Sequence, residues 1–192
     1  MPALPKSPDV TDAIIAGGYL LQSSASIDTC DVHLLASGSI MQQALSAQTK
    51  LQDMGFEVSL WSITSYNELA REAQHCERHN RLHALDAQKI PYVQHLFANT
   101  SGTYVAVSDY MKALPMSIAA WMPANYIALG TDGYGLSESR ATLRDYFEIS
   151  SDYICQAALV GLFRAKHISK ADFKKLQGKL SIDVAKADPM LH

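Results

Sequence analysis

Short apolar runs of strand length alternate along the chain with longer segments in which apolar residues recur at helical spacing. The runs of strand type lie at 31–36, 56–63, 103–107 and 125–129. After the first run, Ile40, Ala44 and Leu51 share one side of a predicted helix, and Gly55 ends it. Strands joined by helical crossovers favour parallel pairing. We therefore expect an α/β fold of three layers, with a mostly parallel sheet covered by helices on both faces.

Polar and proline residues mark where the other helices should begin. Ser65 followed by Glu68 forms a capping box, which predicts a helix start directly after the second strand. Proline is tolerated at the first helical position, so Pro115 should open a helix that runs to about Trp121. The remaining helices are expected to begin near Pro91, Ser139, Ser151 and Ser169.

The first 30 residues differ from the rest. Residues 1–8, MPALPKSP, contain three prolines and no apolar period, which is typical of an extended lead-in. Ser7 and Pro8 could start a short helix through Ala16, which Gly17 and the glycine after it would end. We expect residues 1–30 to form a linker with a short helix and residues 31–192 to form the folded domain.

Composition narrows the possible partners. The 192 residues are 48% hydrophobic and 18% charged, which suits one globular domain with a full core. A formal net charge of -3 gives no basic surface, so we expect neither nucleic acid nor an anionic membrane as a partner. The apolar run AIIAGGYLL is too short to cross a bilayer. Three cysteines without regular spacing, and no secretory leader pattern, favour a cytoplasmic location.

The segment EAQHCERHNRLH contains a possible metal site. His75, His79 and His83 follow one another at four-residue steps, with Cys76 beside the first, so neighbouring pairs could contact one ion on a helix. Zinc sites usually combine ligands from separate elements, and the pattern shows no fourth ligand. A polar helix end is the favoured interpretation. Cys76 with His83 as its base is a weak nucleophile candidate, because a seven-residue separation does not establish contact.

Two turns could contact a ligand. The turn in ASGSIM could present backbone N–H groups to a phosphate. It has neither the three-glycine dinucleotide fingerprint nor the P-loop lysine, so a small-residue turn that lets the helix pack on the sheet is the favoured interpretation. The turn GTDGYG, at 130–135, follows the last strand. We expect its three glycines to adopt backbone angles closed to other residues, Asp132 to bond back to the turn, and Ser137 or Ser139 to cap the next helix. Such a position at the carboxyl end of a parallel sheet suits a ligand or subunit contact.

Five segments together resemble the C-terminal domain of the homodimeric type of pyruvate dehydrogenase, the thiamine diphosphate-dependent decarboxylating component of its complex. They are ASGSI, TSYNELARE, CER-N-LH, SDYMKALP and LGTDGYGLSESRATLRDYFE, at 36–40, 64–72, 76–83, 108–115 and 129–148. More widely, the glycine-rich corner is similar to that of the transketolase C-terminal domain. The lead-in MPALP resembles the segment that joins this domain to the middle domain.

The resemblance implies a role in assembly. In such enzymes thiamine diphosphate and magnesium lie between the N-terminal and middle domains, so no catalytic, cofactor-binding or metal-binding residue is expected in this chain, which also has no GDG motif. Expected partners are the N-terminal and middle domains, a second copy in a homodimer, and the dihydrolipoyl acetyltransferase core. The motifs supply these interface candidates: Glu68, Arg78, His83, Asp109, Asp132, Gly133, Gly135, Ser137 and Arg140.

The chain departs from the family pattern at three positions. Leu136 stands where the family commonly has arginine, so a salt bridge there is not expected. His75 and His79 stand where the family usually has aspartate and tryptophan, which makes these histidines incidental to the motif. Arg140 and Arg144 lie one helical turn apart and either hold an interface or form a solvated face.

Two functions follow from the sequence. The first is that of the C-terminal domain of a pyruvate dehydrogenase, inactive by itself. The alternative is a stand-alone α/β module that binds a small anion or a partner protein at the carboxyl edge of its sheet.

Overall fold

The computed structural model describes residues 8–191, and a five-stranded sheet forms its centre. The strand order is β1-β3-β2-β4-β5. The four parallel strands are β2 (Val32–Ala36), β3 (Val58–Ile63), β4 (Thr103–Val107) and β5 (Tyr126–Leu129). All of them fall within the predicted apolar runs. β2 and β4 are buried along their whole length, as expected for central parallel strands.

Strand β1 (Gly18–Ser23) was not predicted. It pairs antiparallel with β3 at the edge of the sheet, and its register shifts between Leu20 and Gln22. The preceding helix α1 (Pro8–Ala16) ends where expected, because Gly17 has a φ of 113° and its carbonyl accepts from the backbone N–H groups of Thr64 and Ser65. The expected linker therefore contributes a strand. The division of the chain at residue 30 stays a prediction, and most of the proline-rich lead-in lies outside the described residues.

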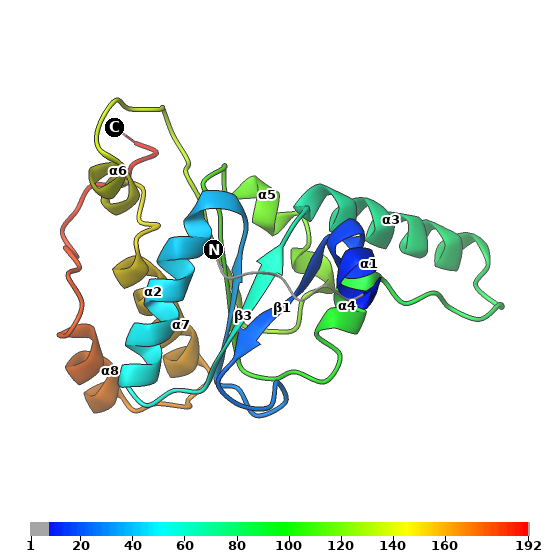
Figure 1. Ribbon diagram of the computed structural model, residues 1–192, viewed down its shortest axis with the longest axis horizontal. Helices are drawn as coiled ribbons and strands as arrows, with labels where there is room; N and C mark the ends of the chain where they lie inside the picture. Colours follow the sequence, from blue (N-terminus) through cyan, green and yellow to red (C-terminus); the bar gives the residue numbers. More distant parts are fainter. Residues whose placement is uncertain (1–7, 192) are drawn as a thin grey trace.

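One face of the sheet is covered by α2 (Met41–Asp53), α6 (Arg140–Tyr146), α7 (Ser151–Arg164) and α8 (Lys170–Gln177). Figure 1 shows these helices together on one side of the sheet. A single 3-10 turn, η1 (Gly38–Ile40), precedes α2. Ser139 and Ser169 cap α6 and α8, accepting from Thr142 N and Asp172 N. These starts agree with the predicted ones.

The opposite face is covered by α3 (Tyr66–Leu82), α4 (Tyr92–Leu96) and α5 (Ala113–Met116), followed by the 3-10 turn η2 (Ala119–Trp121). The capping box is present, since Ser65 Oγ accepts from Glu68 N at 3.1 Å. The continuous helix expected from Pro115 is wrong. Pro115 lies third in α5, where the missing N–H has no intrahelical partner in any case, and the chain then breaks into separate turns.

A buried polar cluster lies under this second layer. His33 on β2 is fully buried and stacks on Tyr104, with ring centroids 4.8 Å apart. Its Nδ1 lies 2.5 Å from Ser59 Oγ, and its Nε2 lies 2.8 Å from the carbonyl oxygen of Ser101. Trp61 Nε1 donates to the same Ser59 hydroxyl at 2.9 Å. Burial lowers the pKa of His33, so the cluster holds a neutral imidazole.

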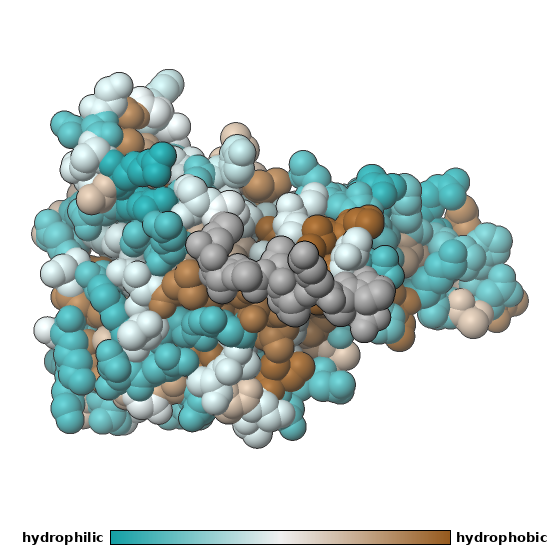
Figure 2. All heavy atoms as spheres, viewed as in Figure 1, coloured by the Kyte–Doolittle hydropathy of each residue, from teal (hydrophilic) through white to brown (hydrophobic). Residues whose placement is uncertain are grey.

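The far end of α3 extends beyond the rest of the molecule (Figure 1), and residues 81–90 are all exposed. In the space-filling view of Figure 2, hydrophobic residues gather in the middle of the face, over β1 and β3, whereas the far end of α3 is mostly hydrophilic. Ile15 and Leu20 are among the exposed large apolar residues. Within the described part of the chain, no helix is both long enough and apolar enough to cross a membrane.

Candidate functional site

Two loops at the carboxyl edge of the sheet are joined by hydrogen bonds, and together they are called the corner here. The loop after β4 carries SDYMKALP, and the loop after β5 carries GTDGYG. Lys112 N donates to Asp132 Oδ1 at 2.7 Å, and Thr131 N donates to the carbonyl oxygen of Tyr110 at 2.8 Å. Gly130 permits this close approach, because an added Cβ would lie 2.5 Å from Lys112 N. Asp132 therefore bonds to the neighbouring loop instead of back to its own turn.

The C-terminal segment crosses the same corner. Gly133 has a φ of 102°, and a Cβ there would meet the carbonyl oxygen of Pro189 at 2.7 Å. Lys186 anchors the segment, since its Nζ donates to the carbonyl oxygen of Asp145 and lies 4.9 Å from the Tyr153 ring centroid. At Gly135 the φ is not positive and a Cβ would have no neighbour within 4 Å. The expectation of special backbone angles thus holds at Gly133 and is wrong at the other two glycines of the turn.

A cavity of about 310 Å³ opens beside the corner. Its polar lining comes from the segments that follow β2, β4 and β5 and from α6. Its apolar wall comes from α6 and the turn after that helix. The lining residues are Ser39, Asp109, Thr131, Arg140, Leu143, Arg144, Phe147 and Ile149. The cavity therefore lies where open parallel sheets bind ligands.

Hydrogen bonds hold part of this lining in place. Ser39 Oγ donates to Asp109 Oδ2, which joins the turn after β2 to the loop after β4. Arg144 Nη2 lies 3.3 Å from both the carbonyl oxygen and the hydroxyl of Ser39. Arg140 is exposed. The structure thus brings Asp109 and Arg140 to one cavity, with Asp132 and Gly133 in the adjoining corner. Thr131 was not singled out from the sequence.

The motif residues on α3 lie elsewhere. Glu68 pairs with Arg71 on the surface, and the hydrogen bond from Arg71 lowers the pKa of the Glu68 carboxyl. Arg78 and His83 lie on the exposed far part of the helix, where His83 Nδ1 is 3.3 Å from Asp86 Oδ2. These three residues therefore do not join the corner.

The three histidines of α3 line a surface hollow without forming a metal centre. The rings of His79 and His83 stack with centroids 4.6 Å apart, and the hollow is also lined by His75. Across the described residues 8–191, no three His, Cys, Asp or Glu side chains are grouped so that they could hold a metal ion.

Neither cysteine considered from the sequence is activated. Cys76 is buried and its Sγ donates to Glu72 Oε1 at 3.0 Å. Burial, together with the Glu72 carboxylate, raises the pKa of Cys76 to about 11, which is opposite to what a thiolate nucleophile needs. Burial likewise raises the pKa of Cys155 to about 12, and Cys155 belongs to the core as expected.

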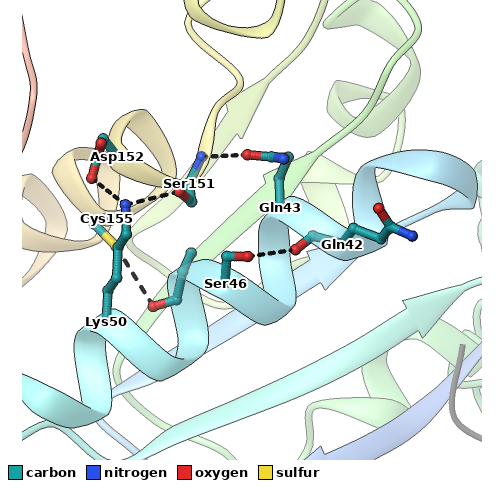
Figure 3. Close-up of polar contacts among 8 residues, drawn as sticks. Gln42, Gln43, Ser46, Lys50, Ser151, Asp152 and Cys155 are labelled. Carbon is teal, nitrogen blue, oxygen red and sulfur yellow. Dashed lines mark hydrogen bonds and ion pairs between the residues drawn. The ribbon is translucent and has the colours of Figure 1, made fainter. Parts of the chain in front are cut away.

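Polar contacts join α2 to the start of α7 (Figure 3). Lys50 Nζ donates to Asp152 Oδ1 at 2.6 Å and to Ser151 Oγ at 3.0 Å. Ser151 N donates to Gln43 Oε1 at 2.9 Å. These contacts were not predicted, because the residues that form them lie about one hundred positions apart in the chain.

The sequence family described as the transketolase-like TK C-terminal domain matches residues 17–150 of this chain, which include the sheet, the corner and the cavity. The chain belongs to this family. The resemblance seen in the motifs is confirmed, and so is the α/β fold class. The family match begins at Gly17 and therefore takes in the edge strand β1.

Similar proteins agree with this assignment. The chain is 37% identical over 193 residues to the pyruvate dehydrogenase E1 component of Escherichia coli K12, covering 100% of the chain and 21% of that protein. It is 36% identical to the E1 component of Pseudomonas aeruginosa, covering 98% of the chain and 21% of that protein. This transketolase C-terminal-like chain thus spans about a fifth of the length of these relatives.

A solved transketolase shares the fold. The crystal structure of transketolase from Campylobacter jejuni aligns with a TM-score of 0.52 at 19% identity, covering 76% of this chain and 18% of that one. At such identity the likeness concerns the arrangement of the sheet and helices alone.

Proposed function

We propose that this chain is the C-terminal domain of a thiamine diphosphate-dependent pyruvate dehydrogenase. The whole enzyme would decarboxylate pyruvate and reductively acetylate a lipoyl group in the cytoplasm. The domain itself would support assembly and dimerisation and be inactive alone. Similarity to E1 components over the whole chain, but over only a fifth of their length, supports this proposal.

The observation that carries the assembly role is the exposure of five large apolar side chains on the loops after β4 and β5 and on α5, together called the corner surface here. Its members and their exposed fractions are Tyr110 69%, Met111 62%, Met116 48%, Tyr134 87% and Leu136 49%. Hydrogen bonds join the loop that carries Tyr110 and Met111 to the start of the loop that carries Tyr134 and Leu136. Several exposed large apolar side chains on neighbouring loops are typical of a surface that another domain covers.

The proposed partners follow from this surface and from the family. They are the N-terminal and middle domains of the same enzyme, a second copy, and the dihydrolipoyl acetyltransferase core. Thiamine diphosphate and magnesium would be held by the other domains. Besides the residues of the corner surface, all the interface candidates from the sequence are retained in this proposal: Glu68, Arg78, His83, Asp109, Asp132, Gly133, Gly135, Ser137 and Arg140.

Immunodepletion tests the proposal on the native protein. An antibody raised to this chain should recognise a band several times larger than 21.0 kDa in source cells and should remove pyruvate dehydrogenase activity from their lysate. A band at 21.0 kDa with undiminished activity in the depleted lysate would contradict the proposal. So would steady release of carbon dioxide by the purified chain with thiamine diphosphate, magnesium and pyruvate.

The role of the corner surface can be tested by comparing a variant of this surface with a control variant elsewhere in the chain. Replacing Tyr134 and Leu136 by serine should reduce self-association of the chain in sedimentation experiments, because both side chains are exposed and apolar. Leu85→Ser changes a fully exposed leucine in the segment that follows α3 and should leave self-association unchanged. Equal effects of the two changes would show that the corner surface has no special part in assembly.

A further inference from the structure

The cavity beside the corner has the composition of a binding site for a small organic anion. Its volume of about 310 Å³ suits a small molecule, and hydroxyl groups of Ser39 and Thr131 lie in its lining. Arg140 and Arg144 add two guanidinium groups from successive turns of α6. Guanidinium groups bind carboxylate and phosphate with paired hydrogen bonds, so the site selects an oxyanion.

The two guanidinium groups are not neutralised by an ion pair. The only hydrogen bonds that Arg144 makes through its guanidinium to described residues are the two long ones to Ser39, a neutral residue. No carboxylate of residues 8–191 lies within ion-pair distance of either arginine. The carboxylate in the lining, that of Asp109, accepts a hydrogen bond from the Ser39 hydroxyl and forms no ion pair with either arginine. Both cations therefore have hydrogen-bonding capacity for a ligand.

The charge and the apolar wall narrow the class of ligand. Two arginines and one aspartate leave the lining with one net positive charge, which matches a monoanion better than a doubly charged phosphate. Leu143, Phe147 and Ile149 form the other wall, against which a short hydrocarbon chain can pack. We propose that the cavity binds a small monocarboxylate with a short apolar chain, the carboxylate on the arginines and the chain on this wall.

This site is separate from the assembly role. The cavity faces α6 and the strand ends, whereas the corner surface consists of apolar side chains on the two interlocked loops and α5. The proposal requires no other domain and no cofactor. It can therefore fail while the assembly role stands, and the reverse also holds.

Nuclear magnetic resonance of the isotope-labelled full chain tests the proposal with butyrate as the probe. Butyrate should shift the side-chain Nε–H signals of Arg140 and Arg144 saturably, with a dissociation constant on the order of 1 mM. Butyramide, which has the same shape without the charge, should cause no such shift. Inorganic phosphate should bind more weakly than butyrate, because Asp109 opposes a second negative charge.

Matched variants assign the binding to the arginines. Arg140→Gln and Arg144→Gln should each weaken butyrate binding by about tenfold or more, since each removes a charge-assisted hydrogen bond. Arg164→Gln changes an exposed arginine at the other end of α7 and should have no effect. Asp109→Asn keeps an acceptor for Ser39 and should raise the affinity for phosphate.

Three results would overturn the proposal. They are the absence of saturable shifts at butyrate concentrations far above the expected dissociation constant, equal binding of butyramide, and undiminished binding by both arginine variants. Phosphate binding more tightly than butyrate in the unchanged chain would also overturn it. Thermal unfolding of each variant shows whether it is folded, and both arginines lie on the surface of a short helix, where substitution to glutamine is tolerated.

Discussion

Replacing Gly133 by alanine should destabilise the chain, whereas the same change at Gly135 should not. The two glycines lie two residues apart in the same turn, but only Gly133 has a positive φ, at 102°. A non-glycine residue held in such a conformation costs roughly 1–3 kcal/mol. The added Cβ would also lie 2.7 Å from the carbonyl oxygen of Pro189, so the C-terminal segment must move.

The net effect can be worked out from these terms. Alanine restricts the unfolded chain and returns about 0.4–1 kcal/mol of stability at either glycine. Surface loops can shift, which limits the cost of the contact with Pro189 to about 1 kcal/mol, the lower end of the range for overpacking. We expect Gly133→Ala to lower the free energy of unfolding by about 2 kcal/mol, or the melting temperature by about 4–8 °C. Gly135→Ala should stay within about 0.5 kcal/mol of the parent.

Urea unfolding followed by circular dichroism measures both changes, and a truncated chain separates the two causes. Ending the chain after Asp183 removes Pro189 but leaves the backbone angle of Gly133 in place. The cost of Gly133→Ala should then fall by about 1 kcal/mol. Equal costs at Gly133 and Gly135, or an unchanged cost of Gly133→Ala in the truncated chain, would refute the reasoning.

Two further predictions concern the core. Burial lowers the pKa of His33, so below about pH 6.5 the unfolded state takes up a proton that the folded state does not. The free energy of unfolding, measured by urea titration, should therefore fall with decreasing pH, by at most about 1.4 kcal/mol per pH unit for this group. His33→Gln should flatten that dependence, and an equally steep profile in the variant would assign it to other groups. A Cβ on Gly161 would lie 2.2 Å from Thr103 Cγ2, so the clash in Gly161→Ala should lower the free energy of unfolding by roughly 1–3 kcal/mol. The higher helix propensity of alanine offsets about 1 kcal/mol of this loss. Thr103→Ser removes that methyl group, so the two changes should be non-additive in urea unfolding, and strict additivity would contradict the contact.

Local signals in the sequence were enough to predict most of the fold. The capping box at Ser65 and Glu68 involves residues three apart, and its hydrogen bond forms as expected. The four parallel strands are short and largely apolar runs, which are recognised without knowledge of their neighbours. Strand β1 was missed because its exposure alternates at a sheet edge and because the strand it pairs with, β3, comes about forty residues later. Nothing in its own composition identifies that partner.

The candidate site was predicted only in pieces, because its contacts are non-local. Ser39 bonds to Asp109, which lies 70 residues away, and to Arg144, which lies 105 residues away. The motifs marked these segments as worth attention, but their convergence on one cavity depends on the strand order of the sheet. In the same way, Gly133 and Gly135 are equivalent in sequence. Gly133 differs in its positive φ and in its contact with Pro189, more than fifty residues later in the chain.

The family motifs separate into two groups once the chain is folded, and the separation bears on their roles. The segments after β2, β4 and β5 meet around the cavity and the corner surface, whereas Arg78 and His83 lie on the projecting end of α3, on the opposite face of the sheet. Because the two groups of motif residues lie on opposite faces of the sheet, a single flat partner surface does not cover both groups. If the whole enzyme buries both groups, two different contacts are required, and substitutions at Arg78 or His83 should weaken assembly independently of substitutions at the corner surface.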